Sequence, residues 1–162
     1  MATATLSSLT ETTLSESALS VDREAGVIKG VKILGAVSKN GREYSRKAME
    51  SAASHYGNCT VNLNHPDRGN AHRERRFQDG IGWFESVSVR GDGVYGDLHL
   101  LKEHEQFGTV CESAERAPKR FGLSHNAEGA VERRDGRDIV EDVEAGHSLP
   151  ILFECTQIKL SN

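Results

Sequence analysis

Ser124 is the candidate nucleophile of this chain. It stands inside the segment 121–129, which begins with apolar residues and ends at a glycine, so we expect it on a strand close to the core. A serine hydroxyl attacks a carbonyl at neutral pH only when a base lies within hydrogen-bond reach and a third group orients that base. No G-x-S-x-G motif surrounds Ser124, which argues against an α/β-hydrolase. The residue therefore indicates acyl transfer, provided that the fold supplies a base.

His65 is the candidate for that base. Val61, Leu63 and His65 have the same parity in a short strand predicted over residues 60–64, and Pro66 ends the strand. A histidine at the rim of a buried face can be held in one orientation, and its pKa lies near neutral pH. The alternative for the same pattern is a structural histidine at a strand end. If Ser124 and His65 meet in space, they form the nucleophile and base of a serine protease.

The elements that must bring these two residues together are mostly strands. Hydrophobic periodicity and turn signals predict strands at residues 27–37, 80–89 and 94–101, and helices at residues 46–56 and 103–117. Ser45 is expected to cap the first helix, and interior glycines such as Gly30 indicate bulges in a curved sheet. We therefore predict an α+β, mainly β fold, in which a mostly antiparallel sheet closes or nearly closes into a β-barrel flanked by a few helices.

Composition narrows the class of function. The net charge is −4, so the chain lacks the excess of positive charge that binding a polyanion requires, and we expect no direct contact with nucleic acid. No apolar stretch of membrane-spanning length and no signal peptide are seen, so we expect no membrane partner. The three cysteines are odd in number and scattered, which favours a reducing compartment over a disulfide framework or a zinc site. We expect no cofactor and no metal.

Five segments, in order along the chain, carry a family resemblance. They are 31–44 with Asn40-Gly41-Arg42-Glu43-Tyr44, then Asn64-His65-Pro66, Gly80-Ile81-Gly82, Gly93-Val94-Tyr95-Gly96-Asp97-Leu98, and Phe121-Gly122-Leu123-Ser124. Together they resemble the prohead proteases of tailed bacteriophages, the capsid-maturation proteases distantly related to herpesvirus assemblin. The similarity covers residues 27–149. It implies an assemblin-like barrel flanked by helices and a serine endopeptidase.

The resemblance also implies a catalytic triad. It carries the nucleophile onto Ser124 and the base onto His65. In the herpesvirus branch the third member is a second histidine on a later strand, and His147 is the matching residue here. In some phage relatives the third member is an acidic residue instead, and the alternatives for that position are Glu141, Asp142 and Glu144.

Two further points concern the same site. The chain departs from the family pattern after His147-Ser148, where it continues as Leu149-Pro150-Ile151-Leu152-Phe153. The third catalytic position depends on that region. Backbone amides near Ser124, or the side chain of Asn126, are candidates for stabilising the oxyanion.

Substrates and location follow from the resemblance as well. Such proteases act inside the assembling procapsid, in the host cytoplasm, on scaffold protein, on the N-terminal arm of the major capsid protein and on themselves. Myovirus relatives cut after a glutamate that stands two positions after an aliphatic residue. Leu9-Thr10-Glu11, Leu14-Ser15-Glu16 and Leu152-Phe153-Glu154 have that form, and we hypothesise self-cleavage after Glu16. A homo-oligomer is compatible with the sequence.

The expected organisation is a flexible N-terminal arm over residues 1–24, a protease domain over 25–155 and a C-terminal tail over 156–162. The main alternative function is a non-catalytic structural protein, associated with capsid or scaffold, that retains the protease fold. A metal-dependent hydrolase using His65 and His72 is a second alternative, although seven positions across a loop match no compact ligand motif.

Overall fold

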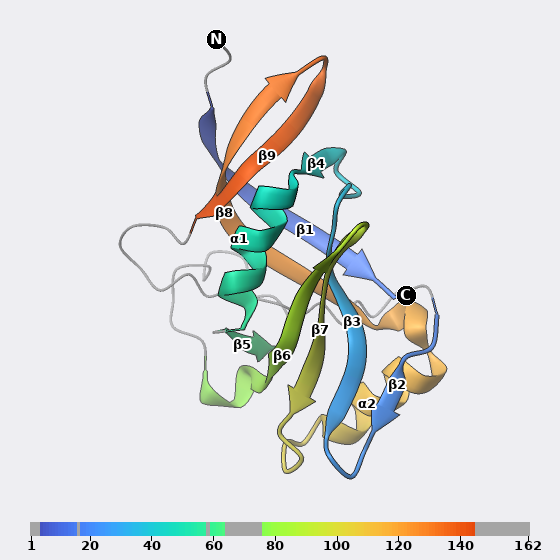
Figure 1. Cartoon of the computed structure of the whole chain (residues 1–162). Coiled ribbons are helices and arrows are strands. Elements are labelled where there is room, and N and C mark those ends of the chain that lie inside the picture. Colours follow the sequence, from blue (N-terminus) through green and yellow to red (C-terminus); the bar gives the residue numbers. More distant parts are fainter. Residues whose placement is uncertain (1–3, 16, 58, 64–75, 145–162) are drawn as a thin grey trace.

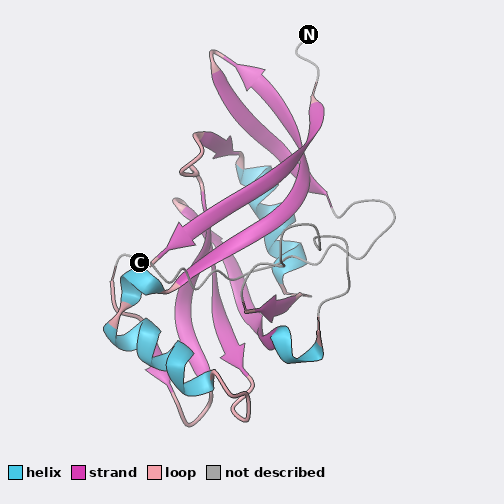
Figure 2. Ribbon diagram, turned by 180° about the vertical axis from the view of Figure 1, so that it is seen from behind, coloured by secondary structure: helices cyan, strands magenta, loops and turns pink. Residues whose placement is uncertain are grey.

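The structure, a computed structural model, describes residues 4–15, 17–57, 59–63 and 76–144 (Figures 1 and 2). In these residues the chain is mainly β, with two α-helices and two short 3-10 helices. In chain order the elements are β1 (Thr5–Leu14), β2 (Ser20–Asp22), β3 (Val27–Gly35), β4 (Arg42–Tyr44), α1 (Arg46–Tyr56), β5 (Thr60–Asn62), η1 (Phe77–Asp79), β6 (Gly80–Arg90), β7 (Gly93–Leu100), α2 (Phe107–Arg116), η2 (Pro118–Arg120), β8 (Gly122–Arg134) and β9 (Arg137–Glu144).

The described strands form two sheets. One has the order β1-β8-β9-β4 and the other the order β2-β3-β7-β6-β5. All neighbours are antiparallel except β4 and β9, which run parallel. The hairpin expected from residues 80–101 is confirmed as β6 and β7, and the bulge expected at Gly30 is confirmed by a shift of register between Ile28 and Val31.

The prediction of a closed or nearly closed barrel is wrong. Both sheets are open, and no backbone ladder among the described strands joins the edge of one sheet to another edge. The two edges of the first sheet are instead bridged by side chains, because Glu11 of β1 contacts Arg42 and Tyr44 of β4. Bulged, glycine-rich strands indicate curvature, but curvature alone does not say whether the edges meet through backbone or through side chains.

Residues 5–14 form a strand where the sequence analysis expected a flexible arm. β1 pairs with β8 along its whole length, from Thr5 opposite Val131 to Leu14 opposite Gly122 (Figure 2). The alternation of a half-buried strand was hidden because only one inward position is a large apolar residue, Leu9, while the buried Glu11 is polar. The boundaries expected for the protease domain and the tail stay a prediction.

The core lies between the sheets and α1. That helix contacts β9 and β4 of the first sheet and β6 of the second, and it buries Ala48, Met49, Ala52 and Tyr56 (Figure 1). Ser45 caps it as expected, because its hydroxyl accepts a hydrogen bond from the backbone N–H of Ala48 at 3.1 Å. α1 therefore anchors both sheets at a fixed separation.

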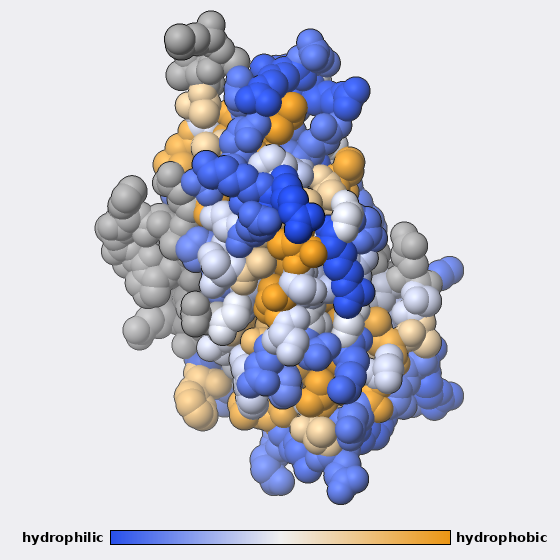
Figure 3. Space-filling model, viewed as in Figure 1, coloured by the Kyte–Doolittle hydropathy of each residue, from blue (hydrophilic) through white to orange (hydrophobic). Residues whose placement is uncertain are grey.

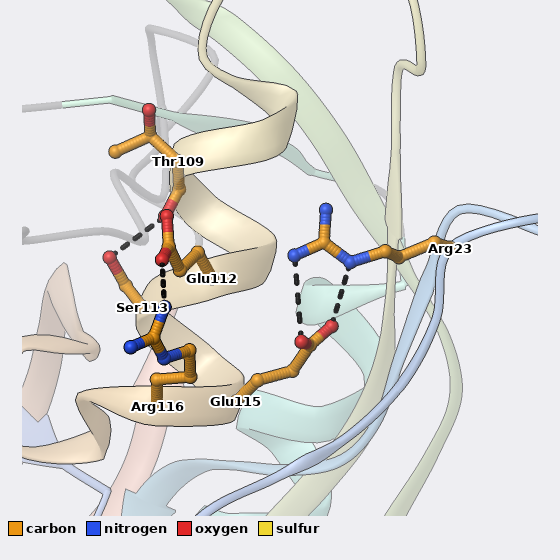
Figure 4. A network of polar contacts seen from close by, with 6 residues as sticks. All are labelled: Arg23, Thr109, Glu112, Ser113, Glu115 and Arg116. Atoms are coloured by element: carbon orange, nitrogen blue, oxygen red, sulfur yellow. Dashed lines mark hydrogen bonds and ion pairs between the residues drawn. The ribbon is translucent and has the colours of Figure 1, made fainter.

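α2 lies at the other end of the second sheet, beside β2. It begins at Phe107 rather than at residue 103, and it buries Val110, Cys111 and Ala114. In Figure 4, Glu115 of this helix faces Arg23 of the turn after β2. The Arg23 Nε lies 2.9 Å from the Glu115 Oε1. This ion pair is exposed, so it orients α2 against the turn more than it stabilises the fold.

Charged side chains cover the β8–β9 hairpin near its turn, and this part of the surface is mostly hydrophilic in Figure 3. Ion pairs link Arg134 to Glu132 and Glu141, and Arg137 to Glu43 of β4. Among the described residues, no helix combines the length and the apolar character needed to cross a bilayer.

Candidate functional site

Ser124 lies near the start of β8 and has no exposed surface. In the ladder it stands opposite Thr12 of β1, and the two hydroxyl oxygens are 3.0 Å apart. Its neighbour Leu123 is buried as well. The expectation of a serine held on a strand against the core is confirmed, and the finding not anticipated is that a second strand of the same chain covers it.

The histidines predicted to act with Ser124, His65 and His147, lie outside the described residues, as does Glu16. The strand that leads toward His65 is β5, an edge of the second sheet, and Val61 and Leu63 are buried there as their shared parity predicted. The side chain of Asn126 is also outside the description, while its backbone stands opposite Thr10 in the β1–β8 ladder. The triad therefore stays a prediction.

The acidic alternatives for the third position lie far along the sheet from Ser124. Asp142 stands opposite Ala130, six positions from Ser124 on β8, which corresponds to about 20 Å of strand. Glu141 is its neighbour on β9 and pairs with Arg134 at 3.1 Å. Glu144 stands opposite Glu128, and its side chain is outside the description. A base bonded to Ser124 would lie too far from Glu141 or Asp142 to be oriented by either.

A buried carboxylate one position before Thr12 is the polar centre that sequence reasoning missed. Glu11 is only 3% exposed, and three side chains donate hydrogen bonds to it. Tyr44 Oη donates to Oε1 at 2.8 Å, Arg42 Nη1 donates to Oε1 at 3.0 Å, and Asn40 Nδ2 donates to Oε2 at 3.1 Å. Charge-assisted bonds of this kind compensate the large cost of removing a carboxylate from water.

The three donors come from one short segment. Arg42 and Tyr44 alternate along β4 and therefore present their side chains to the same side of the strand, whereas Asn40 comes from the turn before it, in which Gly41 has a φ of 79°. Burial and the adjacent Glu11 charge raise the pKa of Tyr44 far above its usual range, so its phenol stays protonated and donates. This is the Asn-Gly-Arg-x-Tyr motif of the sequence, and its three closely spaced hydrogen-bond donors were the signal that could have indicated an anion site.

Leu9 lies on the same side of β1 as Glu11 and is fully buried. It stands opposite Ala127, and space for it exists because position 129 is a glycine: a Cβ on Gly129 would lie 2.5 Å from the Leu9 Cδ1. The inward side of β1 therefore meets an apolar site for Leu9 and a polar site for Glu11, two positions apart.

Two hollows adjoin these elements. One, of about 400 Å³, is lined by Glu11, Thr12 and Thr13 of β1 and also by Lys32 and Lys39. The other, of about 740 Å³, lies at the edge of the second sheet and is lined by residues of β5, β6, η1 and the segment 101–105. Within the described part of the chain, no group of three or more His, Cys, Asp or Glu side chains could hold a metal ion, and His72 lies outside it.

Comparisons with known proteins give a likeness of fold. Neither a scan against protein-family models nor a search of curated proteins finds a match. Among solved structures, the chain is similar to the bacteriophage T4 capsid assembly protease gp21, with a TM-score of 0.62 and 19% sequence identity over 94% of this chain and 98% of that chain. The predicted resemblance to the fold of a phage capsid protease is thereby confirmed, and the relationship to assemblin stays a prediction.

Proposed function

We propose that this protein is a capsid-maturation serine endopeptidase in which Ser124 is the nucleophile, His65 the base and His147 the group that orients the base. The observation that carries the proposal is the likeness of fold to the T4 capsid assembly protease over nearly the whole of both chains. The burial of Ser124 against an extended segment supports it, because a protease must hold a peptide in that conformation beside its nucleophile.

The chemistry assigns one task to each residue. His65 removes the proton from the Ser124 hydroxyl as the oxygen attacks the scissile carbonyl, and it then protonates the leaving amine. Backbone N–H groups near Ser124, or Asn126, donate to the oxyanion. His147 holds the imidazole of His65 in the required tautomer. We favour it over Glu141 and Asp142 because of their distance from Ser124 along the sheet.

The proposed substrates are the scaffold protein and the N-terminal arm of the major capsid protein, cut inside the procapsid in the host cytoplasm. Self-cleavage is proposed after Glu16, two positions beyond the end of β1. The name of the structural neighbour supports a role in capsid assembly. Oligomerisation would bring a second copy within reach for cleavage between chains.

Co-expression with the scaffold and capsid proteins tests the proposal. Ser124→Ala and His65→Ala should each reduce processing on the order of a thousandfold or more, as for other triads. Ser88→Ala, at an exposed serine of β6, is the matched control and should leave processing unchanged. Mass spectrometry should find the wild-type chain beginning at Ser17 and the Ser124→Ala chain intact.

The outcomes separate the candidate functions. Capsid processing that is unaffected by Ser124→Ala would leave the protein as a structural component with a protease-like fold. Processing that is abolished by a chelator and retained in Ser124→Ala would instead indicate the metal-dependent hydrolase.

A further inference from the structure

We propose that the pocket of about 740 Å³ at the edge of the second sheet is a docking site for an arginine side chain in an extended segment of a partner protein, and that Asn62 and Glu103 recognise its guanidinium group. The inference goes beyond the proposed function, because it concerns a second site and requires no reaction at Ser124.

The pocket lies apart from Ser124. Thr13, next to the Thr12 that contacts Ser124, donates from its hydroxyl to the backbone carbonyl of Ile33 on β3 at 3.4 Å. β5 is the edge of this sheet and lies three strand spacings, about 14 Å, from β3. No described residue lines both this pocket and the hollow of about 400 Å³ beside β1. A ligand in the pocket would therefore leave the surroundings of Ser124 unoccupied.

Large apolar side chains form the walls of the pocket. Phe77 of η1 is 97% exposed, Leu101 after β7 is 46% exposed, and Trp83 of β6 is 38% exposed. Apolar surface is visible over η1 in Figure 3. Exposed side chains of this size that gather around one cavity indicate a binding site. Their surface would be covered by a ligand with a long aliphatic stem or a flat group.

Contacts within the chain hold these walls in place without a ligand. The indole of Trp83 stacks on the ring of His99, with 5.5 Å between the ring centroids. His104 accepts a hydrogen bond at Nδ1 from the backbone N–H of Gln106 at 3.1 Å, so its Nε2 carries the ring proton and donates to the Gln78 carbonyl at 2.7 Å. The segment after β7 is thus fixed against η1, and less conformational entropy is lost when a ligand binds.

One buried polar side chain belongs to this apolar lining. Asn62 of β5 is 4% exposed, and its Nδ2 makes only a long contact, 3.4 Å, with the carbonyl of Thr60. The Asn62 Oδ1 has no partner among the described residues. A buried acceptor without a donor costs about 1–3 kcal/mol, so the pocket favours a ligand that brings an N–H or O–H group to this oxygen. An alkyl or phenyl side chain would leave the oxygen unsatisfied.

The rim of the pocket favours a cation. Glu103 and Glu105 line it, are exposed, and form no ion pair with a described residue. Arg76 is the one charged cation among the described lining residues, and its Nη2 lies 3.8 Å from a carboxylate oxygen of Asp79. The two glutamates therefore offer negative charge to a ligand, and they repel a ligand that carries a carboxylate.

These features together describe an arginine side chain. It has an aliphatic stem for the apolar walls, a positive charge for the rim and several N–H donors for Asn62. Lysine shares the stem and the charge, but only the planar guanidinium stacks on an indole while donating in several directions. Free arginine carries an α-carboxylate, which Glu103 and Glu105 repel, so an arginine within a peptide segment is the better occupant.

Binding of short synthetic peptides to the full-length chain tests the inference. The probe is acetyl-Gly-Gly-Arg-Gly-Gly-amide, and its relatives carry lysine, citrulline or norleucine at the central position. Trp83 is the single tryptophan of the chain, so its fluorescence reports binding directly. Citrulline keeps the shape of arginine without the charge, and norleucine keeps only an alkyl stem. Both of these probes should bind at least about tenfold more weakly than the arginine probe, and the lysine probe about threefold more weakly.

Two variants separate the buried acceptor from the charge. Asn62→Leu replaces the acceptor with an alkyl group, so it should weaken the arginine probe about tenfold and tighten the norleucine probe about tenfold. Glu103→Gln changes an exposed side chain and should weaken the arginine probe about threefold at low salt. Glu50→Gln, at an exposed glutamate of α1 outside the pocket, is the matched control and should leave the Kd unchanged. Circular dichroism verifies that each variant is folded.

Each outcome decides the matter. No saturable change of fluorescence up to about 10 mM arginine probe, or equal binding of the arginine, citrulline and norleucine probes, would overturn the inference. So would a Kd that neither Asn62→Leu nor Glu103→Gln alters, and tighter binding of free L-arginine would overturn a protein as the source. None of these readings depends on peptide cleavage, so a failure of the docking site and a failure of the protease assignment are distinguishable.

Discussion

Removal of the single hydroxyl of Tyr44 is the sharpest test of the buried glutamate site. Tyr44→Phe keeps the ring, which is 5% exposed, and deletes the shortest of the three bonds to Glu11, at 2.8 Å. Arg42 and Asn40 still hold the carboxylate, so the variant should fold. The change isolates one donor from an otherwise intact site.

The magnitude follows from burial and charge. A hydrogen bond to a charged group contributes about 1.5–3 kcal/mol when water cannot replace it. For a chain of this length, each kcal/mol lowers the melting temperature by roughly 2–4 °C. We therefore expect Tyr44→Phe to lower the free energy of unfolding by about 2 kcal/mol and the melting temperature by about 6 °C.

Tyr95→Phe is the matched control. Its hydroxyl donates to Asp92 at 2.7 Å, but both groups are accessible to water, so the same substitution should cost under about 1 kcal/mol. Chemical denaturation of both variants, alone and combined with Glu11→Gln, gives the coupling between Tyr44 and Glu11, expected to be at least about 0.5 kcal/mol. Equal losses for the two tyrosines, or no coupling to Glu11, would refute the reasoning.

Three more outcomes are expected. Leu9→Ala should cost about 2–5 kcal/mol in urea denaturation because Leu9 is fully buried, whereas Leu6→Ala, at a residue 60% exposed on the same strand, should cost little, and similar costs would contradict the placement of β1. Ser45→Ala should cost about 1 kcal/mol through loss of the N-cap of α1, and an unchanged denaturation midpoint would argue against that cap. Burial raises the pKa of the Cys59 thiol to about 12, so it carries almost no thiolate at pH 8. Iodoacetamide should therefore modify Cys59 far more slowly in the native chain than in urea, as peptide mass mapping would show, and equal rates would exclude a buried thiol.

Local features were predictable where they depended on neighbours in the sequence. The helix over residues 46–56, its Ser45 cap and the β6–β7 hairpin follow from periodicity and turn residues that act within a few positions. β1 escaped the same reasoning because its inward positions include a glutamate. A charged residue signals a buried strand only when its distant partners are known.

Whether the sheet closes into a barrel also depends on residues that are distant in the sequence. Interior glycines predicted bulges in a curved sheet, and β3 has a shift of register around Gly30. Whether the edges of a curved sheet pair through their backbones depends on the relative placement of strands that are far apart in the chain. Here β4 pairs with β9, while its side chains reach across to β1.

By itself, the sequence determined that the chain is mainly β with two helices, that Ser124 lies on a strand and that the segment 40–44 is a distinctive motif. Only the tertiary structure decided that this motif holds Glu11 and that β1 lies against Ser124. The physical reason is one of range. Periodicity and capping are set by residues within one or two turns of each other, whereas a buried carboxylate is stabilised by donors some thirty positions away, and nothing local distinguishes it from a solvated glutamate.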